Sequence, residues 1–155
     1  MAKENKIRHA ELPVEISSKY LSEGFAKDIM KIYDVDIDLG SKVVQAKMDL
    51  VDPHVSFYGG QPEFYLSVIT AYRYVNQLVN AYVCSMMGDD KQGLEKFFAI
   101  ANEMKTPRPI MTPEGIEAEV VCRKDLERGG NHFMEFSFEL QGGAFTGKLR
   151  GCGKR

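Results

Sequence analysis

Three aspartates at alternate positions, Asp34, Asp36 and Asp38, are the first residues whose type and spacing could do chemistry. Carboxylates spaced in this way begin a calcium-binding loop, which also needs a glycine at its sixth position and a bidentate acid at its twelfth. The chain has Leu39 and Gln45 at those positions. The pattern therefore argues against a calcium loop and favours the solvated edge of a strand.

The cysteines offer no metal or disulfide chemistry. Cys84, Cys122 and Cys152 are odd in number, far apart and without metal-type spacing. We therefore expect reduced thiols, no metal site and no cofactor. The glycines near Lys154 precede no helix, so they do not form a phosphate-binding loop, and no serine, histidine and acid triad with a nucleophile elbow is visible.

Composition limits the class of protein and of partner. A chain of 155 residues fits one domain, and a formal charge of -2 with a pI near 5.9 gives no electrostatic reason to expect nucleic acid. Residues 1–20 form a polar stretch that we expect to be a loosely held leader, followed by a single domain over residues 21–155. No apolar signal-peptide core follows Met1, which favours a cytoplasmic protein.

The element that must position any site is a long apolar stretch from Pro62 to Met87. Proline followed by Glu63 is a typical helix start, and Gly88 is a natural stop, so we predict one helix over this range. Its polar residues in mid-segment argue against a membrane span and give the helix one wetter face. These residues are Arg73, Asn76, Gln77 and Asn80.

The flanking segments predict strands and two shorter helices. Period-two alternation indicates strands near 42–50, 116–123, 132–140 and 144–150, with a hairpin at Gln141 to Gly143. Helical spacing predicts a short helix over 23–32 that ends near Tyr33, and a second helix over 89–104 with Leu94, Phe97, Phe98 and Ile100 inward. Residues 52–61 are expected to be a loop.

This order of elements predicts an α+β domain, an antiparallel sheet wrapped around one long central helix, as in the hotdog architecture. Three motifs point further: residues 75–78 on the helix, residues 117–123 followed by Asp125, and residues 138–144 with Gly147. Together they resemble the FcoT-type (type III) long-chain fatty acyl-CoA thioesterases, from about residue 26 to 150. The resemblance implies a hotdog fold, a homodimer or larger homo-oligomer, and hydrolysis of acyl thioesters of coenzyme A or an acyl carrier protein.

The resemblance also implies catalytic residues. The asparagine of the helix motif is Asn76, the tyrosine that closes the first short helix is Tyr33, and the loop tyrosine before the long helix is best matched by Tyr58. A further family asparagine falls on Ser67, whose hydroxyl lacks the second set of contacts that an amide makes.

Helical projection sets Asn76 at the border of core and pocket, beside the expected substrate-binding residues Tyr65, Tyr72 and Val79. Amides and phenols in a dry pocket stabilise a developing oxyanion without titrating. The alternative role for Asn76 is that of a hydrogen-bonded core amide, and for the tyrosines that of amphipathic rim residues.

Other functions remain open. Asp52 and His54 are reserve catalytic candidates, since a loop aspartate serves as nucleophile or base in another group of hotdog thioesterases. A hotdog dehydratase would pair a loop histidine with an acid on the helix, which carries none beyond Glu63. A non-enzymatic module could bind an acyl chain or acyl carrier near Met86 and Met87 without hydrolysing it.

Overall fold

The structure is a computed structural model that describes residues 10, 29–53, 55–58, 61–87 and 97–153. Its elements follow one another along the chain as strands with a single described helix. They are β1 (Ile29–Asp38), β2 (Val43–Val51), β3 (Ser56–Tyr58), β4 (Gln61–Glu63), α2 (Val68–Met87), β5 (Phe97–Lys105), β6 (Ile116–Arg128), β7 (Asn131–Leu140) and β8 (Phe145–Gly153).

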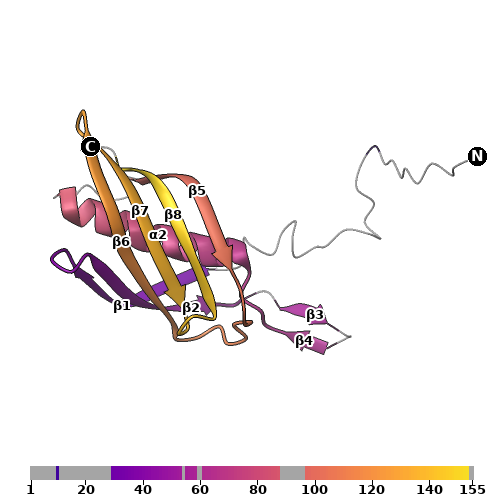
Figure 1. Ribbon diagram of the computed structural model, residues 1–155. Helices are drawn as coiled ribbons and strands as arrows, with labels where there is room; N and C mark the ends of the chain where they lie inside the picture. Colours follow the sequence, from indigo (N-terminus) through magenta and orange to yellow (C-terminus); the bar gives the residue numbers. More distant parts are fainter. Residues whose placement is uncertain (1–9, 11–28, 54, 59–60, 88–96, 154–155) are drawn as a thin grey trace, which may run out of the picture.

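Six strands form one antiparallel sheet in the order β1-β2-β6-β7-β8-β5, so β1 and β5 are its two edges. Helix α2 lies along one face of this sheet, and the separate β3–β4 hairpin projects away from it (Figure 1). The strands predicted near 42–50, 116–123, 132–140 and 144–150 are confirmed, as is the hairpin at Gln141 to Gly143, where all three residues have positive φ. The expected sheet around one long helix is therefore present.

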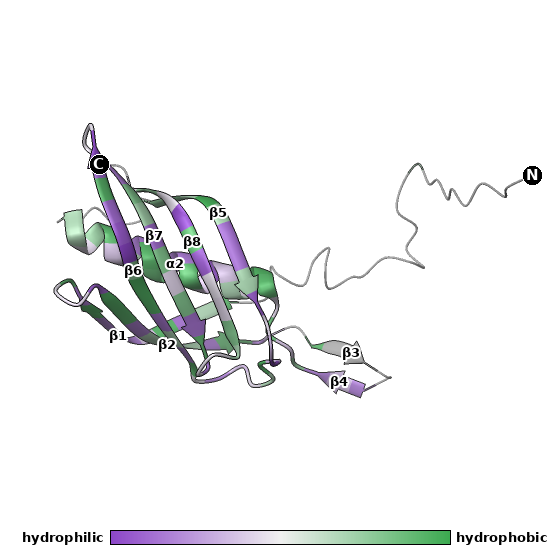
Figure 2. Cartoon of the chain, viewed as in Figure 1, coloured by the Kyte–Doolittle hydropathy of each residue, from purple (hydrophilic) through white to green (hydrophobic). Residues whose placement is uncertain are grey.

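The core fills the space between α2 and the sheet. Alternate residues of each central strand are buried, and Figure 2 shows hydrophobic and hydrophilic residues alternating along these strands. The hydroxyl of Tyr74, on the buried face of α2, donates to the backbone carbonyl of Ile116 at 3.0 Å. Among the largest fully buried side chains are those of Tyr74, Phe136, Met48, Leu78, Ile116, Leu140 and Leu149.

The start of the helix was predicted wrongly: α2 begins at Val68, not at Pro62. Ser67 caps the helix, because its Oγ accepts the N–H of Thr70 at 3.0 Å. Pro62 instead lies in β4, paired with Phe57 in a short hairpin, where a proline on an edge strand loses no sheet hydrogen bond. The expected loop over residues 52–61 thus contains β3 and the start of β4.

The short helix ending near Tyr33 was also predicted wrongly, since residues 29–38 form β1, while residues 23–28 lie outside the described part of the chain. Ile32 pairs with Met48 of β2, and this pairing outweighs the helical spacing of two isoleucines. Asp34, Asp36 and Asp38 are exposed on this edge strand, which confirms the strand-edge interpretation.

The helix expected over 89–104 is contradicted from Phe97 onward, because Phe97–Lys105 is strand β5; Leu94 and its neighbours lie outside the described residues. β5 pairs with β8, where glycines let the two backbones approach closely. Phe98 and Ile100 were expected to point inward, yet 69% and 65% of their surfaces are exposed.

Candidate functional site

An open groove of about 540 Å³ follows the outer side of α2 between the two edge strands of the sheet. Six of its ten lining residues are aromatic or apolar, and amides from α2 provide most of its polar groups. The lining residues are Met30 from β1, Phe97, Phe98 and Ala99 from β5, and Ile69, Tyr72, Arg73, Asn76, Gln77 and Asn80 from α2. Ligand sites are commonly concave and largely apolar with a few convergent polar groups, which this groove satisfies.

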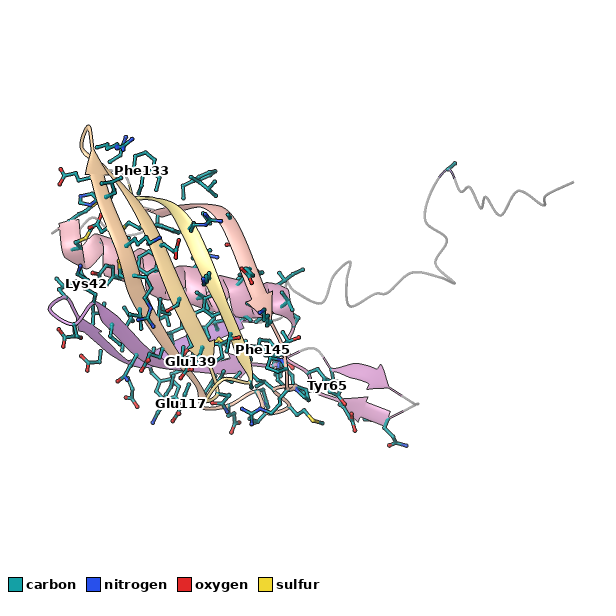
Figure 3. The ribbon with its side chains drawn as sticks, in the orientation of Figure 1. Lys42, Tyr65, Glu117, Phe133, Glu139 and Phe145 are labelled. Atoms are coloured by element: carbon teal, nitrogen blue, oxygen red, sulfur yellow. The ribbon has the colours of Figure 1, made fainter. Side chains whose placement is uncertain are left out.

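Two smaller hollows on the outer face of the sheet have a different character. They measure about 330 and 340 Å³, and charged side chains from several strands line them. Glu139 borders both, and it lies near Glu117 at one end of the sheet (Figure 3). These walls suit an acyl chain less well than the groove along α2 does.

Asn76 lies in the groove, half-buried, with part of its hydrogen-bonding capacity used within the helix. Its Nδ2 donates to the backbone carbonyl of Tyr72 at 2.9 Å, one turn earlier. Because an amide carries two N–H donors and a carbonyl acceptor, this bond orients the side chain while leaving it further capacity. Tyr72, Asn76 and Asn80 follow at intervals of four residues, so they form a polar stripe along one side of α2.

Tyr72 brings a phenol into the same groove. Partial burial, helped by the charge of Glu103, raises the pKa of Tyr72 above its usual value. The phenol therefore stays protonated at neutral pH, where it can donate a hydrogen bond but cannot act as a base.

The structure does not bring Tyr33 together with Asn76 in one chain. The Tyr33 hydroxyl donates to Asp49 Oδ1 at 3.0 Å, and the same oxygen accepts the N–H of Gly115 at 2.7 Å. Asp49 alternates with Met48 and Leu50, which are buried towards the helix, so Tyr33 and Asp49 belong to the opposite side of the sheet.

Ser67 and Tyr65 lie before the groove at the start of the helix. Ser67 caps α2, and its hydroxyl also donates to Thr70 Oγ1 at 3.0 Å. It precedes Asn76 by nine residues, about 13 Å along the helix axis. The Tyr65 hydroxyl donates to Glu63, at the base of the β3–β4 hairpin (Figure 3).

The remaining sequence candidates lie elsewhere. Val79 is fully buried in the core and does not line the groove. Tyr58 is in β3, paired with Gln61 in the projecting hairpin. Asp52 is exposed just after β2, with a left-handed φ of 53°, and His54 lies outside the described residues.

Two groove residues, Asn80 and Phe97, had no predicted role. Asn80 Oδ1 accepts the backbone N–H of Phe97 at 3.3 Å, which ties α2 to β5. The spacing of Asn80 from Asn76 was a usable signal, since residues four apart share a helix face. The position of Phe97 in the groove could not be predicted, because residues 89–104 were expected to form a second helix.

The described residues contain no cluster of three or more histidine, cysteine or acidic side chains able to hold a metal ion. His132 Nδ1 and Asp125 Oδ1 lie 2.7 Å apart and form a pair without a third such side chain among the described residues. No helix in this part of the chain has the length and apolarity needed to cross a bilayer.

Solved structures give the comparison that decides the fold. A hypothetical thioesterase protein from Streptococcus pneumoniae TIGR4, solved with coenzyme A, aligns over 88% of this chain and 96% of its own with a TM-score of 0.52 and 11% identity. A mutant of a hypothetical thioesterase protein from the same organism aligns over 81% of this chain and 89% of its own, with a TM-score of 0.51 and 12% identity. The chain has a hotdog fold.

Hotdog proteins share an architecture across several functions, and an identity near one residue in eight carries the likeness no further than the fold. No protein-family model matches the chain. No curated protein matches it either. The groove along α2 is therefore the basis for inferring the function.

Proposed function

We propose that this protein is an acyl thioester hydrolase, which releases a fatty or related acyl acid from coenzyme A or an acyl carrier protein. The observation that supports this most is the position of Asn76, whose oriented amide faces a groove with apolar and aromatic walls. Such a groove suits an acyl chain, and the amide suits the thioester carbonyl.

In the proposed reaction, water adds to the thioester carbonyl carbon and loses one proton to solvent, the carbon–sulfur bond then breaks, and the leaving sulfur takes up one proton from solvent to become a thiol. The N–H of Asn76 that does not bond Tyr72 would donate to the carbonyl oxygen as its negative charge develops. A donor of this kind contributes about 3 kcal/mol to the transition state. The Tyr72 phenol is a second neutral donor in the same groove.

The resemblance to the FcoT-type thioesterases supports fatty acyl-CoA as the substrate and Asn76 as the amide that binds the thioester carbonyl. It also implies roles for Tyr33, Tyr58 and Ser67, which we keep as secondary proposals because of where these residues lie. Tyr33 is on the far side of the sheet and Ser67 caps the helix. Any direct role for Tyr33 at Asn76 would require a second copy of the chain.

We also propose that the protein forms a homodimer in the cytoplasm. Both edges of the sheet have an irregularity, but they differ in charge: β1 carries three exposed aspartates beside the exposed Ile29, whereas β5 exposes Phe98 and Ile100, the two most exposed large hydrophobic side chains of the described residues. Charges protect an edge from pairing, and an apolar edge invites it. A dimer through β5 would bury these two side chains, and light scattering at micromolar concentration would measure its mass.

A second candidate function is acyl binding without hydrolysis. Among the residues that line the groove, the one charged side chain is Arg73, and none is a carboxylate or a histidine. A groove without a titrating base can hold an acyl chain as a carrier or sensor would.

Thiol release separates the two functions. Purified protein is incubated with saturated acyl-CoAs of increasing length, and free coenzyme A is measured with a thiol reagent. Hydrolysis predicts release that rises linearly with enzyme concentration and falls in Asn76→Asp. Binding of the same acyl-CoAs without thiol release would refute the hydrolase and support the binding module.

A further inference from the structure

Phe97 separates the groove from the hydrophobic core. Its side chain lines the groove, and its ring packs edge to face against the buried ring of Phe136, with centroids 5.6 Å apart and planes at 90°. Phe136 in turn packs edge to face against Tyr82 of α2, with centroids 5.7 Å apart. The three rings form a continuous row that runs from the groove into the core.

Close contacts hold Phe97 in place. A Cβ at Gly151 in β8 would lie 2.4 Å from Phe97 Cζ and 2.2 Å from the carbonyl oxygen of Phe98, so only glycine leaves room for this ring. The backbone N–H of Phe97 is bonded to Asn80. Phe97 is therefore tied to both β8 and α2, and it forms a fixed wall.

The wall formed by Phe97 lies close to Asn76, the amide proposed to bind the thioester carbonyl. Asn80 follows Asn76 by four residues, so the two amides lie about 6 Å apart along the helix axis. Phe97, bonded to Asn80, therefore lines the groove about one helical turn beyond Asn76.

We propose that Phe97 is a specificity-determining residue that limits the length of the acyl chain the groove accepts. The inference rests on the proposed acyl thioester function and deepens it. A chain that runs from Asn76 towards Asn80 meets the Phe97 ring, and its methylenes beyond that point stay in water. Each methylene buried before that point strengthens binding by about fourfold, and each one beyond it adds nothing.

The test measures binding without turnover. Saturated acyl-CoA thioether analogues, which water cannot cleave, are titrated by calorimetry in order of increasing chain length. For the wild type we expect affinity to rise with chain length and then to level off. In Phe97→Ala the rise continues to longer chains, and in Phe97→Leu it continues by a smaller amount.

Phe133→Ala is the matched control. It removes the same ring from the outer face of the sheet near the β6–β7 turn, where Phe133 is 44% exposed (Figure 3). Its binding profile is expected to equal that of the wild type. Circular dichroism and light scattering check that each variant keeps the wild-type fold and mass, and if Phe97→Ala fails to fold, Phe97→Leu decides.

The result that overturns the role of Phe97 is an unchanged levelling-off point in folded Phe97 variants, or no binding of any analogue by the wild type. Thiol release from the matching acyl-CoAs is measured separately. A chain-length shift without thiol release supports the inference and refutes only the hydrolysis, whereas thiol release without a shift refutes only the role of Phe97.

Discussion

The hydroxyl of Tyr74 donates a hydrogen bond to the backbone carbonyl of Ile116, 3.0 Å away, and both residues are fully buried. This bond joins the first half of α2 to the first residue of β6. Tyr74→Phe leaves the buried carbonyl without this donor, so we expect the free energy of unfolding to fall by about 1–3 kcal/mol. Urea denaturation measures the loss, and Tyr72→Phe, on the groove side of the same helix, is expected to lose much less.

Ser67 tests whether a residue implied to be catalytic is in fact a helix cap. Ser67→Ala removes the acceptor for the Thr70 N–H and is expected to lower the free energy of unfolding by about 1 kcal/mol. Ser67→Asn keeps a good capping residue and restores the asparagine that the FcoT-type resemblance implies. We expect Ser67→Asn to match the wild type in thermal denaturation; a large gain in thiol release by this variant would instead support a catalytic role at this position.

Buried phenols make the fold sensitive to alkali. Burial raises the pKa of Tyr82 to about 12, and burial also raises the pKa of Tyr74 far above its usual value. Above pH 10 these phenols ionise in the unfolded chain but stay protonated in the folded one, so the folded state binds more protons and stability falls as pH rises towards 12. Each such phenol contributes a slope of up to about 1.4 kcal/mol per pH unit.

Chemical denaturation between pH 9 and pH 12 checks this slope. The free energy of unfolding of Tyr82→Phe is expected to fall less steeply with pH over this window than that of the wild type, because phenylalanine does not titrate. An equal slope in the two proteins would contradict the assignment to Tyr82.

Tyr33 tests whether the catalytic roles implied by the FcoT-type resemblance apply to this chain. Its hydroxyl bonds Asp49 on the side of the sheet away from the helix. We therefore expect Tyr33→Phe to lower the rate of thiol release much less than a change at Asn76 does. A loss as large as that of Asn76→Asp would indicate that a second copy brings Tyr33 to the groove.

The sheet was predictable where the pattern within a strand is strong. Residues 116–123 and 132–140 alternate between buried and exposed side chains, and this period-two pattern is local, so it can be read from the chain alone. The hairpin at Gly142 was equally predictable. Its turn has consecutive residues with positive φ, a conformation that favours glycine, and the sequence has two adjacent glycines there.

The edge strands could not be predicted in the same way. Both strands are defined by their pairing: Ile32 of β1 pairs with Met48 of the following strand, and Ala99 of β5 pairs with Gly151, which is distant in sequence. The spacing of apolar residues within each of these segments suited a helix, but pairing with a neighbouring strand made each of them a strand. The helix start failed for a related reason, because the Ser67 cap outweighed a proline and acid signal further upstream.

The candidate site was predictable only in its centre. Asn76 projects to the border of core and pocket from helical geometry alone, and it does line the groove. The opposite wall comes from β5, so Phe97 could not be assigned until that segment was known to be a strand. The resemblance implied that Tyr33 is catalytic together with Asn76, and the alternation of β1 and β2 puts Tyr33 on the other side of the sheet.

The central claim is that the Asn76 amide, and not a carboxylate, stabilises the reacting thioester. The direct measurement is the rate constant for thiol release from a saturated acyl-CoA by Asn76→Asp and Asp52→Asn, each with unchanged fold. Asn76→Asp replaces amide donors with an acceptor-only carboxylate, so we predict a loss on the order of a hundredfold, while Asp52→Asn stays near the wild type. The reverse ranking, with Asp52→Asn inactive and Asn76→Asp near normal, would contradict the account.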